Sequence, residues 1–259
     1  MRNTIKRLTC LAAVCAAALA TSMLPSQADP IFWTDWQTGN TTSGFAGFGQ
    51  ITTTTSTVNV SYTNLNGIQF YQTGASGETD YWVNGGSFVR NPARSPYTSP
   101  LVDNIPTGTD MIALNAAGTQ TLTFSQAIAN PVFSYVSLNG NGYAFDQDFD
   151  ILSFGDGTVR DTGYWGAGTS FKDIVPIGGG NFEYQLLGTG EPHGTIRFKG
   201  AFDSVTWRSL SSESWNGFTV GVQGTRAEIL DTPEPGSIAL FTAFGVVGTG
   251  LLARRRRKA

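Results

Sequence analysis

The sequence predicts an all-β protein whose body, residues 29–230, folds as a single antiparallel β-sandwich or jelly-roll-like domain. Several short segments alternate apolar and polar residues with a period of two, which places successive side chains on opposite faces of a strand. Turn-forming residues separate these segments, and the chain contains 32 glycines. The body carries no helical stripe of any length, whereas a parallel α/β sheet would need helices between its strands.

Five segments carry the alternation that predicts half-buried strands. The clearest one contains Val58, Val60 and Tyr62, and the residues between and beside them are polar. Four later segments repeat this pattern, with apolar residues at Leu122 and Phe124, Ile196 and Phe198, Val205 and Trp207, and Phe218, Val220 and Val222. In each segment we expect one face in the core and the other in water.

The connections between strands are predicted from glycine, asparagine and proline. Asn-Gly-Asn-Gly at 139–142, Gly-Asp-Gly at 155–157 and three glycines at 178–180 accept positive φ at low cost and close hairpins. Four prolines fall within the irregular segment 74–109, which we interpret as a long surface excursion. The consecutive threonines at 52–55 are favoured in strands and form no regular array.

The body is large enough to hold an ordinary hydrophobic core. It spans 202 residues, which suits one substantial all-β domain. Both cysteines, Cys10 and Cys15, precede it, so its stability has to come from packing and not from a disulfide. Lipid attachment at either cysteine is the alternative use, but Thr9 and Val14, which precede them, do not fit the small-residue requirement for lipidation.

Charge is divided unevenly along the chain. The formal net charge is −3, yet residues 29–230 hold 17 acidic and only eight basic residues, a net charge of −9. Neutralising phosphates requires a basic surface, so this acidic body excludes a nucleic-acid partner. An acidic surface instead favours solubility or the binding of cations.

The first 28 residues are expected to be a signal peptide. Three basic residues precede an apolar stretch at 8–20, and Ser-Gln-Ala at 26–28 offers small residues at the positions that a signal peptidase reads. We therefore expect signal peptidase to cleave after Ala28 and the body to be exported.

The last 29 residues, 231–259, combine three features in a fixed order. A short motif of Pro233, Glu234 and Pro235 is followed by an apolar run of 18 residues at 236–253. As a helix this run spans about 27 Å, close to the roughly 30 Å hydrocarbon core of a bilayer. The run ends in a basic cluster of Arg254, Arg255, Arg256, Arg257 and Lys258. Such a cluster is costly to translocate, so it is expected to stay in the cytoplasm and hold the body outside.

This tail resembles the PEP-CTERM sorting signal of exported Gram-negative proteins. The resemblance covers about a tenth of the chain, and it implies that a membrane-embedded exosortase recognises Pro233, Glu234 and Pro235 and cleaves nearby. It implies an inner-membrane intermediate followed by location at the cell surface or outside the cell. The same kind of tail is also catalogued as an ice-binding protein C-terminal domain, a label that implies nothing about ice. A single-pass anchor that is never processed is the alternative.

Asp146, Asp148 and Asp150 form the densest cluster of carboxylates. On one extended strand they share a face, but alternate residues lie about 6.6 Å apart, whereas calcium holds its oxygens within about 2.3–2.6 Å of itself. A calcium site therefore requires the backbone to turn, with Asn139 or Asn141 as further ligands. The spacing resembles the start of an EF-hand loop, but the required glycine and glutamate are absent. The alternative is a solvated strand face.

Aromatic residues near predicted loops are candidates for stacking on sugar rings, because each is an amphipathic ring suited to a wet site. They are Trp33, Trp36, Tyr81, Trp82, Tyr164 and Trp165. Tyr164 and Trp165, flanked by glycines, are the strongest pair. The alternative for all six is packing in the core or at its rim.

No catalytic residue is predicted. His193, the single histidine, lies in a Glu-Pro-His-Gly turn, and the body carries no nucleophile, zinc or phosphate-binding motif. We therefore expect a non-enzymatic surface or extracellular-matrix protein associated with exopolysaccharide. The alternatives are a lectin-like carbohydrate-binding module, with or without calcium, and an exported glycan hydrolase that uses two converging carboxylates.

Overall fold

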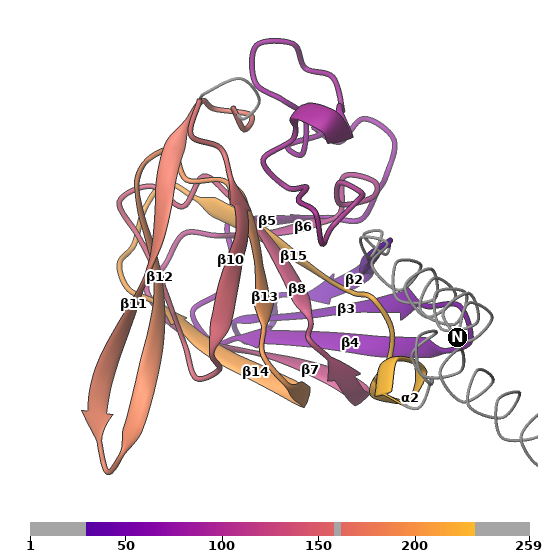
Figure 1. The fold of residues 1–259 in the computed structure, drawn as a ribbon, viewed down its shortest axis with the longest axis vertical. Helices are drawn as coiled ribbons and strands as arrows, with labels where there is room; N and C mark the ends of the chain where they lie inside the picture. The colour runs from indigo at the N-terminus through magenta and orange to yellow at the C-terminus, as the bar shows by residue number, and fades with distance from the viewer. Residues whose placement is uncertain (1–29, 158–161, 231–259) are drawn as a thin grey trace, which may run out of the picture. The chain divides into compact units, whose positions relative to one another are not determined.

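The structure, a computed structural model, describes residues 30–157 and 162–230 (Figure 1). These belong to one compact unit, Ala28–Asp231. The predicted cleavage site at Ala28, the motif of Pro233, Glu234 and Pro235, and the tail beyond it lie outside the described residues. Within the described part, no helix is long and apolar enough to cross a membrane.

Within residues 30–157 and 162–230, fifteen strands form two sheets in which all pairs are antiparallel, so the all-β prediction is confirmed; the jelly-roll-like connectivity stays a prediction. The seven-stranded sheet has the order β10-β13-β8-β15-β6-β5, with β1 paired to β15. Its strands are β1 (Phe32–Trp33), β5 (Phe70–Gln72), β6 (Met111–Leu114), β8 (Val132–Val136), β10 (Phe149–Phe154), β13 (Gly194–Phe198) and β15 (Asn216–Val222).

The eight-stranded sheet has the order β11-β12-β9-β14-β7-β4-β3-β2. Its strands are β2 (Asp35–Asn40), β3 (Phe45–Thr52), β4 (Thr57–Asn64), β7 (Gly118–Ala129), β9 (Tyr143–Phe145), β11 (Gly168–Gly178), β12 (Asn181–Gly190) and β14 (Ala201–Ser209). Two short helices complete the described fold, η2 (Pro92–Arg94) and α2 (Arg226–Leu230).

The main core lies between the two sheets and is rich in aromatic rings. Phe133 of β8 stacks on Phe218 of β15, with ring centroids 5.0 Å apart, and Trp207 of β14 meets Phe133 edge to face. Strand β4 buries Val58, Val60 and Tyr62, as its alternation predicted. Burial of each large apolar side chain contributes about 1.5–3 kcal/mol, so this core holds the sheets together.

The segment 74–109 is irregular, as predicted, but it is not a surface excursion. Its Trp82, Tyr97 and Ile105 are buried and pack with Met111 and Val136 in a second core on the other face of the seven-stranded sheet. An irregular segment gives no periodic signal, so its apolar residues could not be assigned to a face from the sequence.

This second layer buries the centre of the seven-stranded sheet on both sides. The Thr195 hydroxyl on β13 donates to the carbonyl of Tyr97 at 3.0 Å. All seven residues of β15 are buried, including Thr219, which was expected to face water. This hydrogen bond satisfies the buried Thr195 hydroxyl, whereas the Thr219 hydroxyl is buried with no hydrogen-bond partner among the described residues, a cost that the packing around β15 has to offset.

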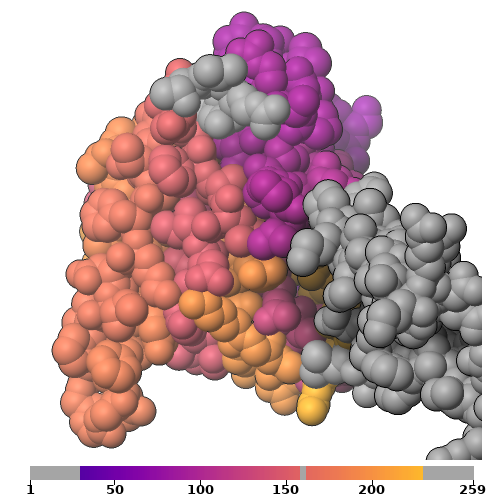
Figure 2. All heavy atoms as spheres, viewed as in Figure 1, coloured from indigo at the N-terminus to yellow at the C-terminus, as the bar shows by residue number. Residues whose placement is uncertain are grey.

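Strands β11 and β12 form a long hairpin that extends from the body like a finger (Figures 1 and 2). Only Tyr184–Leu186 of β12 pairs with a further strand, β9, so the outer part of the hairpin has no neighbour on that side. The hairpin closes through Gly178, Gly179 and Gly180, all with positive φ, which confirms the turn predicted there.

Loops from distant parts of the chain meet at one end of the sandwich, here called the loop end. The backbone N–H of Gly85 donates to the carbonyl of Gly163 at 3.0 Å, and that of Glu191 donates to Ala167 at 3.1 Å. Gly163 also packs directly against the ring of His193. The segment 74–109, the turn before β11 and the β12–β13 connection are therefore fixed to one another.

Candidate functional site

Six aromatic side chains gather at the loop end. They come from β5, from the segment 74–109, from the turn before β11 and from the loop between β14 and β15. We call this cluster the aromatic platform, and its members are Phe70, Tyr81, Phe88, Tyr164, Trp165 and Trp215.

The rings of the aromatic platform contact each other mainly edge to face. Centroids of Tyr164 and Trp165 lie 4.7 Å apart at 76°, and Tyr81 contacts Tyr164 and Trp215 at 4.9 Å each. This arrangement is favoured for aromatic pairs. It leaves Trp165 52% exposed and Phe88 62% exposed, so two of the rings have broad contact with water.

Glycines explain how Tyr164 and Trp165 reach the surface. Tyr164 and Trp165 occupy the tip of a tight turn in which the Gly166 N–H donates to the Gly163 carbonyl at 3.2 Å. A Cβ at Gly163 would lie 2.2 Å from the His193 ring, so no other residue fits there without displacement. Phe88 is held with φ of 52°, a left-handed conformation that non-glycine residues adopt only where their surroundings impose it.

The six aromatic residues proposed from the sequence divide into two groups. Tyr81, Tyr164 and Trp165 are brought together in the aromatic platform, and their role in glycan stacking stays a prediction. The other three are buried in the cores, namely Trp33, Trp36 and Trp82.

Sequence reasoning missed Phe70, Phe88 and Trp215, the other half of the aromatic platform. Only Trp215 carried a local signal, because it lies in a serine-rich loop where an apolar ring has no strand to pack in. Phe70 and Phe88 join the cluster through tertiary contacts that no local sequence pattern predicts.

Two carboxyl groups belong to loops that meet at the loop end, Glu191 in the β12–β13 connection and Glu213 in the loop between β14 and β15. Glu191 accepts hydrogen bonds from the Ser137 hydroxyl, at 2.7 Å, and from the Asn139 side chain. Glu213 accepts from Asn216 at 2.5 Å. Burial raises the pKa of Glu213 to about 7, a shift that its hydrogen bonds oppose and the charge of Glu191 reinforces.

His193 is a structural residue of the loop end. It is fully buried in the β12–β13 connection, and its Nδ1 accepts from the Ser137 backbone N–H at 3.1 Å. Burial lowers the pKa of His193 to about 3, so the ring is neutral at physiological pH. It supports Gly163 and the turn that carries the exposed rings.

The three aspartates proposed as calcium ligands do not lie on one strand, which corrects the expected geometry. Strand β9 ends at Phe145 and β10 begins at Phe149, so Asp146 and Asp148 belong to the connection and Asp150 to β10. The backbone turns here because the core requires both phenylalanines, which contact each other at 5.6 Å.

Lysines already neutralise two of these carboxylates. Asp148 pairs with Lys172 and Lys199, and Asp150 lies 2.8 Å from Lys199. Asp146 instead accepts from the Thr206 backbone N–H at 3.2 Å. The described residues contain no group of three or more acidic, histidine or cysteine side chains placed to hold a metal ion.

The two asparagines proposed as further calcium ligands are engaged elsewhere. Asn139 donates to Glu191, and the side-chain oxygen of Asn141 accepts from the Ser211 N–H at 3.0 Å. Both asparagines are therefore held by protein partners, and the function proposed below does not depend on calcium.

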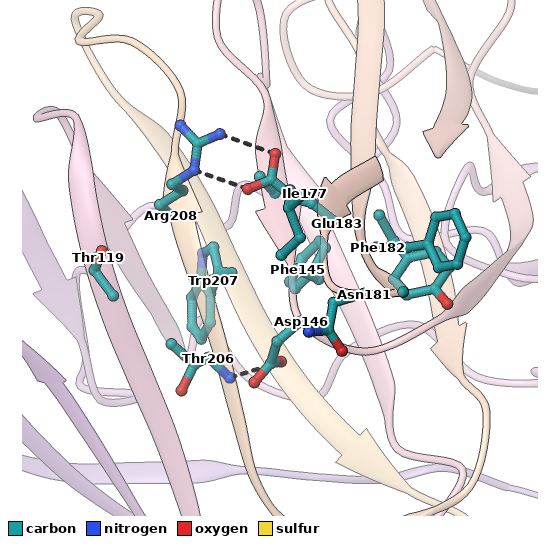
Figure 3. A pocket seen from close by; sticks show the side chains of 13 residues that line it. Thr119, Phe145, Asp146, Ile177, Asn181, Phe182, Glu183, Thr206, Trp207 and Arg208 are labelled. Carbon is teal, nitrogen blue, oxygen red and sulfur yellow. Dashed lines mark hydrogen bonds and ion pairs between the residues drawn. The ribbon is translucent and has the colours of Figure 1, made fainter. Parts of the chain in front are cut away.

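A separate groove of about 510 Å³ lies between the hairpin tip and the eight-stranded sheet (Figure 3). Glu183 and Arg208 form a two-pronged ion pair across it, at 2.8 and 2.9 Å, and this pairing holds the pKa of Glu183 below its usual range. Asp146 and Thr206 line the same groove. Within this groove, Glu183 and Arg208 therefore satisfy each other's charges.

Together the fold and the loop end define an all-β protein of two antiparallel sheets with exposed aromatic rings at the loop end. Comparisons with protein-family models, with curated proteins and with solved structures find no match for this chain.

Proposed function

We propose that this is an exported surface or extracellular-matrix protein that binds glycan without catalysis, through the aromatic platform. The observation that carries the proposal is the half-exposed Trp165, supported edge to face by Tyr164 and lying 6.5 Å from Tyr81. The apolar faces of sugar rings stack on such side chains, while hydroxyls contact polar groups at the rim.

The surroundings of the aromatic platform support a binding role. The edge-to-face contacts and the hydrogen bonds of the loop end fix the ring positions before a ligand arrives, which reduces the entropy lost on binding. His193 is neutral and buried and serves as a positioning residue for the turn.

Export and surface location rest on the two ends of the chain. The charged and apolar pattern of residues 1–28 supports secretion, and the Pro-Glu-Pro motif at 233–235 with its apolar run and basic cluster supports sorting by an exosortase. A matrix polysaccharide is the partner that fits both this destination and the aromatic platform.

The Trp165→Ala variant tests the proposed site. Glycan-array binding of the mature protein should fall about tenfold or more, because the largest exposed ring face is lost. Phe48→Ala is the matched control, since Phe48 is 50% exposed on β3 and outside the aromatic platform. Equal loss in both variants, or binding unaffected by Trp165→Ala, would place any glycan site elsewhere.

Two further readouts from the same protein separate the alternatives. We expect EDTA to leave binding unchanged. Loss of binding in EDTA would instead support the alternative function, a calcium-dependent lectin-like module. Release of reducing ends from the host's exopolysaccharide would instead support the hydrolase, and we expect none.

A further inference from the structure

A hydrogen bond closes the loop between β14 and β15 around Trp215 of the aromatic platform. The Nδ2 atom of Asn216, which begins β15, donates to Oε1 of Glu213 at 2.5 Å. Trp215 lies between these two partners in the chain, and its ring contacts those of Phe70 and Tyr81 at 5.2 and 4.9 Å. We call the Glu213–Asn216 contact the clasp. It fixes the short piece of chain that presents Trp215 to the other rings.

A buried tyrosine sets the orientation of the clasp. The hydroxyl of Tyr143 on β9 donates to Oδ1 of Asn216, which leaves the Nδ2 of Asn216 to donate to Glu213. Burial and the charge of Glu213 raise the pKa of Tyr143, so this hydroxyl keeps its proton. The other carboxyl oxygen of Glu213, Oε2, is buried and has no hydrogen-bond partner among the described residues. Ionisation of Glu213 in the closed loop therefore leaves a charge whose second oxygen is unsolvated.

Two titratable groups face Glu213 among the described residues, and neither stabilises its charge. They are the neutral Tyr143 and the acid Glu191, which comes from the β12–β13 connection. Burial raises the pKa of Glu213 to about 7, the charge of Glu191 adds to this shift, and hydrogen bonds from Asn216 and Asn141 oppose it. The closed clasp thus favours the protonated acid.

We infer that ionisation of Glu213 opens the clasp and loosens Trp215, so that the aromatic platform binds glycan more weakly as the pH rises through neutrality. The inference rests on the proposed function and adds a regulation of that site. A carboxylate gains free energy when both of its oxygens reach water, and Oε2 reaches water only if the loop between β14 and β15 moves. That movement displaces Trp215 from its contacts with Phe70 and Tyr81.

Proton linkage gives the sign and size of the effect. In the open loop the carboxyl group has its ordinary pKa of 4.5, whereas in the closed loop burial raises the pKa of Glu213 to about 7. Between these values the closed loop holds a proton that the open loop releases, so a rise in pH favours opening. For one proton, the equilibrium constant for opening should increase about tenfold between pH 6 and pH 8.

Hydrogen exchange of single backbone amides tests the clasp without any glycan. The Glu213 N–H donates to the Asn115 carbonyl at 3.2 Å, so it exchanges when the loop opens. In the mature protein its protection, corrected for the intrinsic effect of pH on exchange, should fall about tenfold from pH 6 to pH 8. The Asn130 N–H, which donates to Gly200 at 2.7 Å near the opposite end of β8, is the internal control and should keep its protection.

Glu213→Gln separates the charge from the hydrogen bond. The substitution keeps an oxygen that accepts from Asn216 but removes the ionisable group, so protection of the same amide should be equal at pH 6 and pH 8. Asp203→Asn is the matched control, because Asp203 is exposed on β14, and it should keep the tenfold fall. Constant protection in the unsubstituted protein, or an undiminished fall in Glu213→Gln, overturns the inference.

The glycan array, read at pH 6 and at pH 8, connects the clasp to binding. We expect binding that depends on Trp165 to weaken about three- to tenfold at pH 8 in the unsubstituted protein and to stay constant in Glu213→Gln. Equal binding at both pH values overturns the regulation while the proposed glycan site stands. An array that is silent at both pH values refutes the proposed function and the regulation of binding together, and a tenfold change in protection would then show a pH-sensitive loop alone.

Discussion

Glu228 gives the threonine run at 52–55 a structural role that strand propensity alone did not predict. Its carboxylate accepts from the Thr53 hydroxyl at 2.7 Å, the Thr55 N–H at 3.0 Å and the Thr225 N–H at 2.7 Å. Thr53 and Thr55 thus join helix α2 to the β3–β4 turn. From the sequence these threonines predicted only a strand, because their partner lies more than 170 residues away.

Glu228→Gln should therefore lower stability in a pH-dependent way. Burial alone would raise the pKa of Glu228, but hydrogen bonds, led by that from Thr55, lower it from the usual 4.5 to about 2. A depressed folded-state pKa contributes stability above pH 4.5 that is lost as the pH falls through about 2. We expect the substitution to cost about 1–2 kcal/mol at pH 7, after allowance for solvent screening.

Urea denaturation of both proteins at pH 7 and at points down to pH 2 measures this effect. The difference between them should shrink steadily on acidification. A difference that stays constant across this range would show that the carboxylate charge of Glu228 is not what stabilises the contact.

Among the elements, sequence periodicity found strands whose apolar residues alternate with polar or glycine residues, including β15 although all of it is buried, and missed β8, whose apolar residues do not alternate. Strands β4 and β14 alternate because one of their faces meets solvent. Strand β8 is buried at all five positions, so it shows no alternation and was not predicted. The reason is the layer formed by the segment 74–109, whose packing is encoded in tertiary contacts and not in a local period.

Trp82→Ala tests whether that layer is structural. Trp82 is fully buried, meets Tyr97 edge to face at 5.0 Å and donates its indole N–H to the Asp110 carbonyl at 3.3 Å. Truncation should cost about 3–5 kcal/mol, the usual range for a buried tryptophan. Phe48→Ala in β3 is the exposed control and should cost far less.

Denaturant unfolding of both variants gives the comparison. A small cost for Trp82→Ala, close to that of Phe48→Ala, would mean that the segment 74–109 is only loosely attached. A large cost would also predict weaker glycan binding, because neighbouring Tyr81 belongs to the aromatic platform.

At the scale of the whole molecule, the candidate site was only partly visible in the sequence. Tyr164 and Trp165 stood out because glycines flank them, and Tyr81 was among the other candidates. The meeting of four chain segments at the loop end, which adds Phe70 and Trp215, depends on the closed sandwich. A sequence shows which side chains suit a wet surface, whereas their convergence is a property of the fold.

Sorting is also a prediction about the whole chain. Replacing Pro233, Glu234 and Pro235 together with alanine should leave the body folded but change the mass of the mature protein and its location, because the expected processing enzyme reads this motif. Replacing Ser211, Ser212 and Ser214 with alanine provides a control of equal extent in the body. An unchanged mass and location after substitution of the motif would leave the C-terminal run as a plain membrane anchor.

The attachment of α2 to the β3–β4 turn also limits the length of chain between the folded body and the Pro-Glu-Pro motif. The last described residue, Leu230, stands three residues before Pro233, and a fully extended chain of that length covers about 10 Å. An enzyme that recognises the Pro-Glu-Pro motif would therefore have to act close to the surface of the folded body. Loosening the Glu228 contact would release α2 from the β3–β4 turn, so we expect Glu228→Gln to speed any processing at this motif as well as to lower stability.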